Sequence, residues 1–393
     1  MDGTKLPPEY LNRYSSATSR IPGLQLTEIP KTPIAPAVPV SSKQDESPAP
    51  RPAWYNPRGW SLRRRLIVAI GILTAIVVIV VGTVEGVRAN RYPDYSPLNY
   101  KLVDSYEGAS FFDRFNYFSD QDPTDGTVVH IRYVNEDAAL DLNLTYATDT
   151  SAILRVDSVT PKAIGGRNSV RIESWSTYDN GLFIFDIIHT PYGCGTWPAL
   201  WLTDGYNWPD NGEIDVLETT NEGSHGNDVT LHTTEGCKMN VKRKHTGYPV
   251  FSNCDNTTHS NAGCMITGTP STYGRLMNEN GGGIYALEIR DAGIRVWFFP
   301  RDSIPGDINS PDPSTWGIAF ADFPSTECDI PSHFKNQSII ANIDLCGELA
   351  AQPQFYTERD HCPGTCAEFV ANNPSSFEDA YWEFASFKVY QAM

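Results

Sequence analysis

The stretch NWPDNGEIDVLETTN places three carboxylic acids, Glu213, Asp215 and Glu218, within six residues. Apolar residues lie between them, and such alternation is typical of a strand with one face in a core. Acids are poor strand formers and are costly to bury, so three of them in one apolar strand indicate a function. The chemistry that needs them is cleavage of a glycosidic bond, in which two carboxyl groups about 5–5.5 Å apart act as an ionised nucleophile and a protonated acid.

The spacing of the acids decides which of them can act together. Side chains alternate between the two faces of a strand, so Glu213 and Asp215 share a face and Glu218 points the other way. A β-bulge between Asp215 and Glu218 adds one residue to the count and returns Glu218 to the first face; bulges are frequent beside active sites. The bulge also directs the intervening apolar residues to the core: Ile214 and one or both of Val216 and Leu217.

Three acids on one face also influence each other's ionisation. Neighbouring carboxyl groups push their pKa values apart, which keeps one of a pair protonated near neutral pH while the other stays ionised. Asp215, between the other two, can hydrogen-bond the nucleophile and hold it in place. One alternative is a solvated acidic face, which fits poorly among apolar neighbours. Another is a Ca²⁺ site, which favours loops that also supply backbone carbonyls. The residue chemistry therefore favours a glycosidase.

The charge of the 393-residue chain is unevenly distributed. Residues 1–65 hold ten Lys and Arg against five Asp and Glu, and residues 66–84 hold no charged side chain. The remaining 20 basic and 42 acidic residues follow, so residues 85–393 carry a net charge of −22. A domain this acidic repels polyanions, which argues against a nucleic-acid partner. The 9 Trp and 19 Tyr suit a carbohydrate site, although core packing explains most aromatic residues in any protein.

All of the cysteines follow the apolar segment: Cys194, Cys237, Cys254, Cys264, Cys328, Cys346, Cys362 and Cys366. An even number on one side of a candidate membrane span indicates disulfides in an oxidising compartment. We predict two short-loop pairs, Cys254–Cys264 and Cys362–Cys366. A zinc site at Cys362-x-x-x-Cys366 is the competing interpretation, but a second pair at metal-ligand spacing is missing. Three glycosylation sequons begin on the same side, at Asn143, Asn256 and Asn336.

The N-terminal part predicts a tail and a membrane anchor. Residues 1–65 are rich in proline and lack apolar periodicity, so we expect a disordered tail, which can serve as a spacer or bind an SH3-like or WW-like domain. Residues 66–84 are 19 uncharged residues, about 28 Å as a helix, and fit a membrane span better than a buried core helix. More arginines precede the span than follow it, which places the N-terminus in the cytoplasm: Arg58, Arg63, Arg64 and Arg65 before it, and Arg88 and Arg91 after it.

The sequence therefore predicts a single-pass type II membrane protein with its large domain outside the cell or in the secretory lumen. We expect a stem over residues 85–105 and one domain over 106–393. Within the domain, RNSVRIESW, NGLFIFDIIHTPYG, NQSIIANIDLCG and YWEFASFKVYQ read as strands, and GIYALEIRDAGIRVWFFPR reads as a hairpin that turns at Asp291–Gly293. Long loops over 237–283 and 300–335 interrupt the strands. Many short strands without βαβ alternation predict an all-β jelly-roll sandwich of two antiparallel sheets.

The segment GEIDVLE has the E-x-D-x-x-E form that resembles the catalytic signature of glycoside hydrolase family 16, in its fungal laminarinase or endo-1,3(4)-β-glucanase branch. Further stretches resemble the same branch in order along the chain: GCGTWPALWLTDGYNWPDN, VTLHTTEGCKM, GIRVWFFPR, ANIDLCG and CPGTCAEFVANNPSSFEDAYWEFASFKVYQ. The resemblance runs from about Tyr106 to the C-terminus. It implies a concanavalin A-like jelly roll with a glucan-binding cleft, and it implies no cofactor and no metal.

The resemblance also implies roles for individual residues. Glu213 matches the nucleophile, Asp215 the assisting acid and Glu218 the general acid/base. Around them, Trp201 and Trp208 match aromatic residues that line sugar subsites. His232 matches a polar residue near the site, and the alternative is a strand histidine that bonds to a backbone group. Trp197 is a further subsite candidate that could equally belong to the core. The family often has a Trp-containing turn after LCG, whereas this chain reads LCGELAA.

Three functional hypotheses follow from these residues. The first is a retaining endo-β-glucanase that hydrolyses β-1,3-glucan, mixed β-1,3/1,4-glucan or both. The second is a cell-wall transglycosylase, in which another sugar replaces water as the acceptor. The third is a glucan-binding, lectin-like module without activity, against which the presence of all three acids argues.

Overall fold

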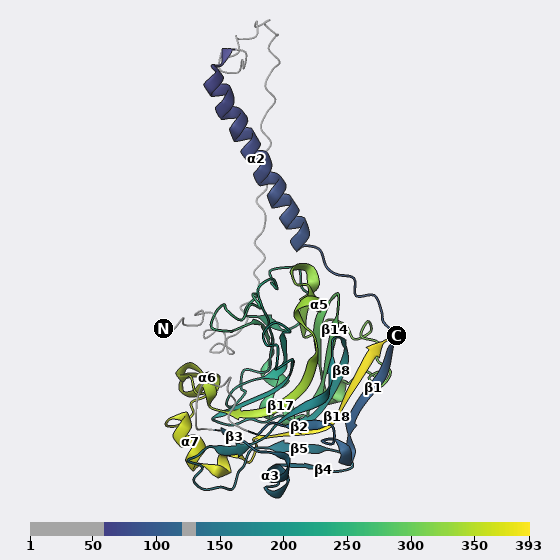
Figure 1. Ribbon diagram of the computed structural model, residues 1–393, viewed down its shortest axis with the longest axis vertical. Helices are drawn as coiled ribbons and strands as arrows, with labels where there is room; N and C mark the ends of the chain where they lie inside the picture. Colours follow the sequence, from purple (N-terminus) through teal and green to yellow (C-terminus); the bar gives the residue numbers. More distant parts are fainter. Residues whose placement is uncertain (1–58, 120–130) are drawn as a thin grey trace, which may run out of the picture. The chain divides into compact units, whose positions relative to one another are not determined.

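The computed structural model describes residues 59–119 and 131–393. The predicted proline-rich tail covers residues 1–65, of which 1–58 lie outside the described residues, as does the prediction of an SH3-like or WW-like partner; residues 62–65 are helical. The described chain contains a long apolar helix and a β-rich domain (Figure 1).

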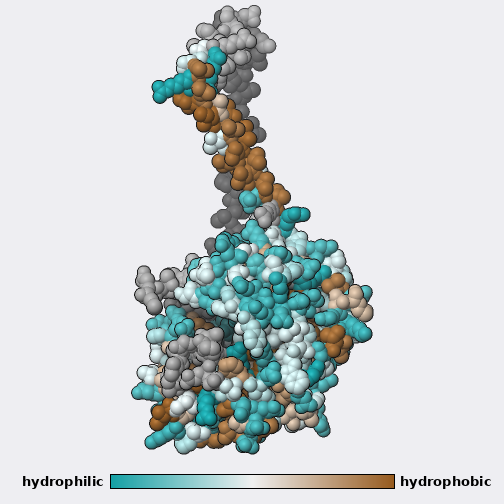
Figure 2. Space-filling view, in the orientation of Figure 1, coloured by the Kyte–Doolittle hydropathy of each residue, from teal (hydrophilic) through white to brown (hydrophobic). Residues whose placement is uncertain are grey.

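Helix α2 spans Leu62–Ala89, and its residues 66–84 carry no charged side chain. At 28 residues it is about 42 Å long, and its segment Leu62–Val87 is long and apolar enough to cross a membrane. Figure 2 shows its apolar side chains as a continuous surface, none of which is buried in the described structure. The hydroxyl of Thr83 donates to the Ile79 carbonyl at 2.8 Å, so this polar group is satisfied within the helix, as a hydrocarbon environment requires.

Two eight-stranded antiparallel sheets make up the domain. The first has the order β16 (Ala321–Pro324), β15 (Gly293–Pro300), β14 (Gly283–Arg290), β8 (Gly181–His189), β18 (Tyr381–Ala392), β5 (Ala152–Arg155) and β4 (Thr145–Ala147), with β1 (Tyr100–Glu107) also paired to β18. The second has the order β12 (Tyr248–Pro249), β13 (Cys264–Thr267), β11 (Asp228–His232), β10 (Glu213–Glu218), β9 (Thr196–Thr203), β17 (Gln337–Leu345), β7 (Arg171–Tyr178) and β2 (Phe115–Tyr117). A small parallel pair joins β3 (Ile131–Tyr133) and β6 (Arg167–Ser169).

The connections between the strands, as far as the structure describes them, contain only short helices. The α-helices are α3 (Glu136–Asp141), α4 (Gly274–Glu279), α5 (Ile330–His333), α6 (Gly347–Ala350) and α7 (Cys366–Asn372). The 3₁₀ turns are η3 (Gly108–Ser110), η4 (Pro270–Thr272), η5 (Arg301–Ser303), η6 (Ser325–Glu327) and η8 (Pro374–Phe377), and η7 (Gln354–Arg359) is a π-helical turn.

The core lies between the two sheets. Phe183, Phe185 and Ile187 of β8 belong to the same buried cluster as Leu202 of β9 and Ile214 of β10. Alternate residues of β8 belong to a second cluster on the other face of the first sheet, where residues 304–319 cover them. The prediction of a β-sandwich of two antiparallel sheets is confirmed, and Figure 1 shows β8, β14 and β18 side by side in one of them.

Local predictions along the strands are confirmed, with one correction. The hairpin β14–β15 turns where predicted, and Gly293 has a φ of +150° at a point where an added Cβ would lie 2.1 Å from the Tyr95 hydroxyl. The two long loops, however, contain secondary structure: 237–283 includes β12, β13 and α4, and 300–335 includes β16 and α5. These strands have only two to four residues, too few for a two-residue periodicity to stand out.

The segment expected to be a stem is packed on the domain over much of its length. Strand β1 begins at Tyr100, inside residues 85–105, and pairs with β18. Before it, the hydroxyls of Tyr92 and Tyr95 donate to Asp322 at 3.1 and 3.4 Å, and the Arg295 guanidinium lies 4.0 Å from the Tyr95 ring centroid. Residues 92–105 are therefore part of the domain surface, because side-chain contacts with distant strands hold them there.

All eight cysteines form disulfides, and one of the two predicted pairs is wrong. Cys254–Cys264 is present, but Cys362 pairs with Cys194 and Cys366 pairs with Cys346. The reason is tertiary: β9 and β17 are paired, so the cysteine before β9 and the cysteine after β17 lie at neighbouring strand ends, where the segment 362–366 packs. The fourth bridge is Cys237–Cys328.

Candidate active site

The three acids of β10 lie on the face of the second sheet that points away from the core, here called the acid face. Glu213 pairs with His232 and Asp215 with Thr230 on β11, but Glu218 pairs with Asp228, so two residues of β10 oppose a single residue of β11. This is the predicted bulge. The residues between the acids, Ile214, Val216 and Leu217, are fully buried in the core. The bulge therefore returns Glu218 to the face of Glu213 and Asp215, as the spacing required.

An indole group contacts each of the two glutamates. Trp197 Nε1 donates to Glu218 Oε1 at 2.8 Å, and Trp208 Nε1 donates to Glu213 Oε2. Trp197 is half-buried on β9, so it belongs to the acid face and not to the core. Trp208 is 38% exposed and lies in the loop after β9. Both tryptophans thus hold a carboxylate with the ring edge while part of the ring surface stays accessible.

The loop that carries Trp208 is organised by one buried aspartate. Asp204 accepts hydrogen bonds from the side chains of Asn207 and Asn211 at 2.8 Å each and of Asn336 at 3.0 Å. Burial would raise the pKa of Asp204, but these bonds and one from the Tyr206 amide outweigh it and lower the pKa. The ionised carboxylate of Asp204 therefore fixes the loop between β9 and β10.

Asp215 and His232 form the buried part of the site. His232 Nε2 lies 3.4 Å from Asp215 Oδ2, and His232 Nδ1 lies 2.9 Å from Asn261 Oδ1, so both ring nitrogens have a partner. One atom of each of Glu213, Asp215 and His232 lies within 4.8 Å of the others. Asp215 therefore lies close to both Glu213 and His232.

The surroundings of Glu218, Asp215 and His232 shift the pKa values of all three groups. Burial raises the pKa of Glu218 to about 7, and the charge of Glu213 adds to the rise, while the bond from Trp197 opposes it. Burial and the charge of Glu213 also raise the pKa of Asp215. Burial alone would lower the pKa of His232, but its bond to Asp215 and the surrounding carboxylates raise it to about 9.

Trp201 lies beside Asp215 on the acid face. It pairs with Asp215 across β9 and β10, its Nε1 donates to Asn342 Oδ1 on β17 at 2.8 Å, and the Arg171 guanidinium lies 5.0 Å from its ring centroid. Trp201, Trp208, Trp197 and His232, all predicted as substrate-binding residues, are therefore gathered around the acids. Their contact with a sugar remains a prediction.

Sequence reasoning missed several polar residues of this site. Asp228, opposite Glu218, receives hydrogen bonds from Thr267 Oγ1 at 2.5 Å and lies 3.0 Å from His225 Nε2. The neighbouring Asn227 contacts the backbone of the bulge. These residues lie in the stretch GSHGND, whose composition reads as a turn, and no local signal distinguishes them from other turn residues.

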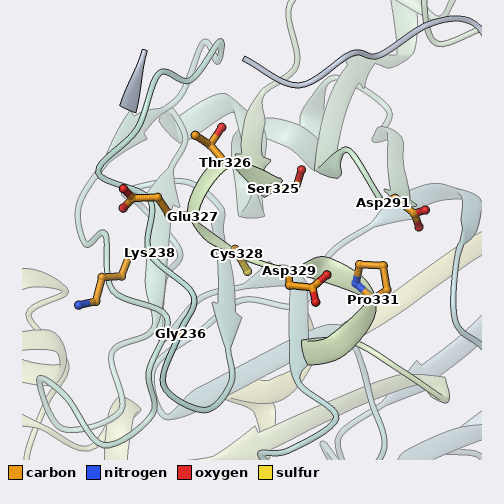
Figure 3. Close-up of a pocket in the computed structure, with 9 residues that line it drawn as sticks. All are labelled: Gly236, Lys238, Asp291, Ser325, Thr326, Glu327, Cys328, Asp329 and Pro331. Atoms are coloured by element: carbon orange, nitrogen blue, oxygen red, sulfur yellow. The ribbon is translucent and has the colours of Figure 1, made fainter. Parts of the chain in front are cut away.

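A pocket of about 670 Å³ lies elsewhere on the domain (Figure 3). It is formed by the turn between β14 and β15, the segment 325–331 and the residues around Gly236 and Lys238. Its described lining contains none of the predicted site residues, so this pocket is separate from the acid face. The sequon residues Asn143 and Asn336 are exposed and Asn256 is half-buried; their glycosylation remains a prediction.

The sandwich fold and the paired glutamates define a glycoside hydrolase of the jelly-roll type. The family described as XgeA-like, catalytic GH16 domain, matches residues 115–390, and the chain belongs to this family. The identity of the fold and of the family predicted from the sequence is thereby confirmed.

Relatives in fungi support the same assignment. A Schizosaccharomyces pombe protein named as a probable glycosidase is 43% identical over 309 residues, which cover 77% of this chain and 72% of that protein. An Arthroderma benhamiae endo-1,3(4)-β-glucanase is 41% identical over 302 residues, covering 74% of this chain and 65% of the relative. The chain spans about half the length of other relatives, such as the Emericella nidulans endo-1,3(4)-β-glucanase, of which it covers 47%.

Solved structures give the same result. Laminarinase 16A from Phanerochaete chrysosporium, studied with β-glucans in its donor and acceptor sites, matches with a TM-score of 0.71 and 43% identity over 75% of this chain and 100% of that chain. A structure described as an elongating family 16 β-1,3-glucosyltransferase matches with a TM-score of 0.69 and 38% identity over 74% of this chain and all of that one.

Proposed function

We propose that this protein is a membrane-anchored retaining endo-β-glucanase. The observation that carries the proposal is the bulge in β10, which brings Glu213 and Glu218 to one face while burial raises the pKa of Glu218 to about 7. A carboxyl group with this pKa can be protonated near neutral pH, as a general acid must be. The relatives named endo-1,3(4)-β-glucanase favour β-1,3-glucan or mixed β-1,3/1,4-glucan as the substrate.

The reaction would proceed in two steps. Glu218 donates its proton to the glycosidic oxygen while the carboxylate of Glu213 attacks the anomeric carbon, so the bond to the leaving sugar breaks and a glycosyl ester on Glu213 forms. Glu218, now ionised, then accepts a proton from water as the water oxygen attacks the same carbon. The ester breaks, the nucleophile is free again and Glu218 is reprotonated.

The neighbouring residues would support these steps. A protonated Asp215 can donate a hydrogen bond to the nucleophile, consistent with its raised pKa. His232, whose Nε2 lies 3.4 Å from Asp215 Oδ2, would hold the Asp215 carboxyl group in place. The tryptophans Trp201, Trp208 and Trp197 would provide ring surfaces for the glucosyl units that flank the scissile bond.

Glutamine variants test the assignment of the two glutamates. Glu218→Gln should lower the rate of reducing-end release from laminarin by about 10²–10⁴-fold, and Glu213→Gln should lower it to background. Glu383→Gln is the matched control, because Glu383 is a half-buried strand glutamate in the other sheet. NMR of the first product should show the β-anomer. An α-anomer would exclude the double displacement, and a wild-type protein inert on laminarin and mixed-linkage glucan would exclude the glucanase.

A second candidate function is transglycosylation. The 38% identical structure described as an elongating glucosyltransferase favours it, because transfer uses the same glycosyl ester with a sugar hydroxyl in place of water. Chromatography of the products from laminari-oligosaccharides distinguishes the two: products longer than the substrate indicate transfer. A lectin-like module would bind laminarin without forming any product.

The anchor and its orientation belong to the same proposal. Helix α2 would span the membrane with the N-terminus in the cytoplasm, since arginines are concentrated on that side. The protein should then resist carbonate extraction, and glycosidase treatment should increase its mobility through loss of glycans on Asn143, Asn256 or Asn336. In sealed microsomes, whose outer surface is the cytoplasmic one, protease should remove the N-terminal tail and spare the domain, and the reverse pattern would contradict this orientation.

A further inference from the structure

The bulge in β10 takes backbone groups out of the sheet ladder. On the β11 side, Val216 and Leu217 together oppose one residue, Val229. On the β9 side, Asp215 pairs with Trp201 and Leu217 with Leu200, so Val216 has no partner residue there. Backbone N–H and C=O groups that leave a ladder inside a protein must find other partners, because a buried group without one is costly.

The side chain of Asn227 supplies both kinds of partner. Its Oδ1 accepts a hydrogen bond from the Glu218 amide at 3.0 Å, and its Nδ2 donates to the Val216 carbonyl at 2.8 Å. The two partners determine the orientation of the amide, because an N–H needs the oxygen and a carbonyl needs the NH₂ group. Asn227 thus pairs with the bulge as a peptide group of a neighbouring strand would, and it is fully buried.

Asn227 is itself held on both sides. Its backbone N–H donates to Thr272 Oγ1 at 2.9 Å, and its carbonyl accepts from the Gly268 amide at 2.8 Å. Before it, Gly226 has a φ of +109°, and a Cβ at this position would lie 2.3 Å from the Thr269 carbonyl oxygen. The turn that carries Asn227 is therefore packed tightly on residues 268–272, and the amide has little freedom to follow a movement of the bulge.

We propose that Asn227 is a positioning residue for the general acid: its side chain sets the width of the bulge and so aims the carboxyl group of Glu218 at the glycosidic oxygen. This inference rests on the role proposed above for Glu218. A shift of one residue in strand register turns a side chain to the opposite face, so the bulge determines on which face of the sheet Glu218 lies. The amide bond to the backbone N–H of Glu218 acts directly beside the Cα from which that side chain extends.

If the Asn227 side chain only stabilises the fold, its loss should lower the cleavage rate of every substrate alike. If it positions Glu218, its loss should lower only the rates that need a proton from Glu218. Cleavage of laminarin needs a proton from Glu218, whereas a dinitrophenyl β-laminaribioside has a leaving group that departs without one. Azide, added as an acceptor, attacks the glycosyl ester without a general base. We therefore compare the rate of laminarin cleavage without azide with the rate of aryl glycoside cleavage with azide. The ratio of these two rates depends on how well the carboxyl group of Glu218 is positioned.

The test measures this ratio in the full-length protein for Asn227→Ala. We expect the rate on laminarin to fall by roughly 10–100-fold, part of the contribution of a general acid, while the rate on the aryl glycoside with azide changes little. Asn221→Ala is the matched control: Asn221 is also fully buried and bridges two backbone groups, the Gly195 amide at 2.8 Å and the Ala350 carbonyl at 3.1 Å, neither of which belongs to β10. Its ratio should equal that of the wild type.

An equal loss on both substrates, or no loss on either, overturns the inference while leaving the glucanase assignment intact, since the wild-type protein still cleaves laminarin. If Asn227→Ala does not fold, Thr272→Val decides the question with the same ratio. Valine removes the acceptor that holds the Asn227 N–H, so a smaller fall in the same direction is expected, and an unchanged ratio overturns the proposal.

Discussion

Trp197 Nε1 donates a hydrogen bond to Glu218 Oε1 across 2.8 Å, from the strand beside the one that carries the acid. This bond favours the ionised form of Glu218 and opposes the rise in pKa that burial causes. Trp197 therefore limits how far the pKa of Glu218, the proposed general acid, rises.

Trp197→Phe should raise the pKa of Glu218, because phenylalanine keeps an aromatic ring but cannot donate the bond. The general acid must be protonated, so activity is lost as the pH rises through this pKa, near 7 in the wild type. We expect the basic limb of the kcat/KM profile to move to higher pH in the variant. The control is Trp175→Phe, which removes a comparable bond to Asn116 on the surface. A basic limb at the wild-type position would contradict the assignment.

The acid cluster should make the folded protein less stable as the pH rises. Glu218 has a folded pKa of about 7 against an ordinary value of 4.5, and His232 has about 9 against 6.5. Both groups bind protons more tightly in the folded protein. Each contributes its full stabilisation below its unfolded pKa, and this stabilisation is lost as the pH rises through its folded pKa. The windows are about 4.5–7 for Glu218 and 6.5–9 for His232.

Variants isolate these two contributions from the rest of the molecule. The free energy of unfolding of Glu218→Gln, relative to the wild type, should increase between pH 4.5 and 7, and that of His232→Gln between pH 6.5 and 9. Urea denaturation at several pH values measures both differences. A pH-independent difference for either variant would show that the group titrates alike in the folded and unfolded chain.

The loop that carries Trp208 should depend on Asp204. Asp204→Asn should lower the free energy of unfolding by about 2 kcal/mol, because three asparagine NH₂ groups lose an ionised acceptor, and should raise KM for laminarin more than it lowers kcat. Asp307→Asn is the control, since Asp307 organises the segment 304–319 on the other sheet through bonds to Trp316 and Thr315. It should lose stability without a change in KM; equal KM values in the two variants would refute the link.

The cysteine pairing can be tested by the position of one free thiol. Cys366→Ser should leave Cys346 as the alkylated residue, whereas a local Cys362–Cys366 bridge would leave Cys362. Removing both Cys346 and Cys366 opens a loop of 20 residues in sequence and should lower the free energy of unfolding by about 3 kcal/mol. Peptide mapping and guanidinium denaturation measure the two outcomes.

Local sequence patterns were enough to predict the sandwich, the hairpin at Asp291–Gly293 and the bulge between Asp215 and Glu218. Each rests on a two-residue alternation or on turn residues close together in the chain, and the bulge follows from counting three acids against that alternation. The same reasoning predicts the apolar segment 66–84, whose composition is a local property.

The disulfide partners and the side chains that contact the acids depend on the pairing of strands from distant parts of the chain. Pairing of β9 with β17 decides that Cys362 and Cys366 reach Cys194 and Cys346, and pairing of β10 with β9 and β11 brings Trp197 to Glu218 and Asn227 to the bulge. No short stretch contains this information, because many residue pairs of the same types could meet in a sandwich and only the packed core selects one register. The chain by itself thus determined which chemistry is present, and the tertiary structure decided which side chains hold and tune it.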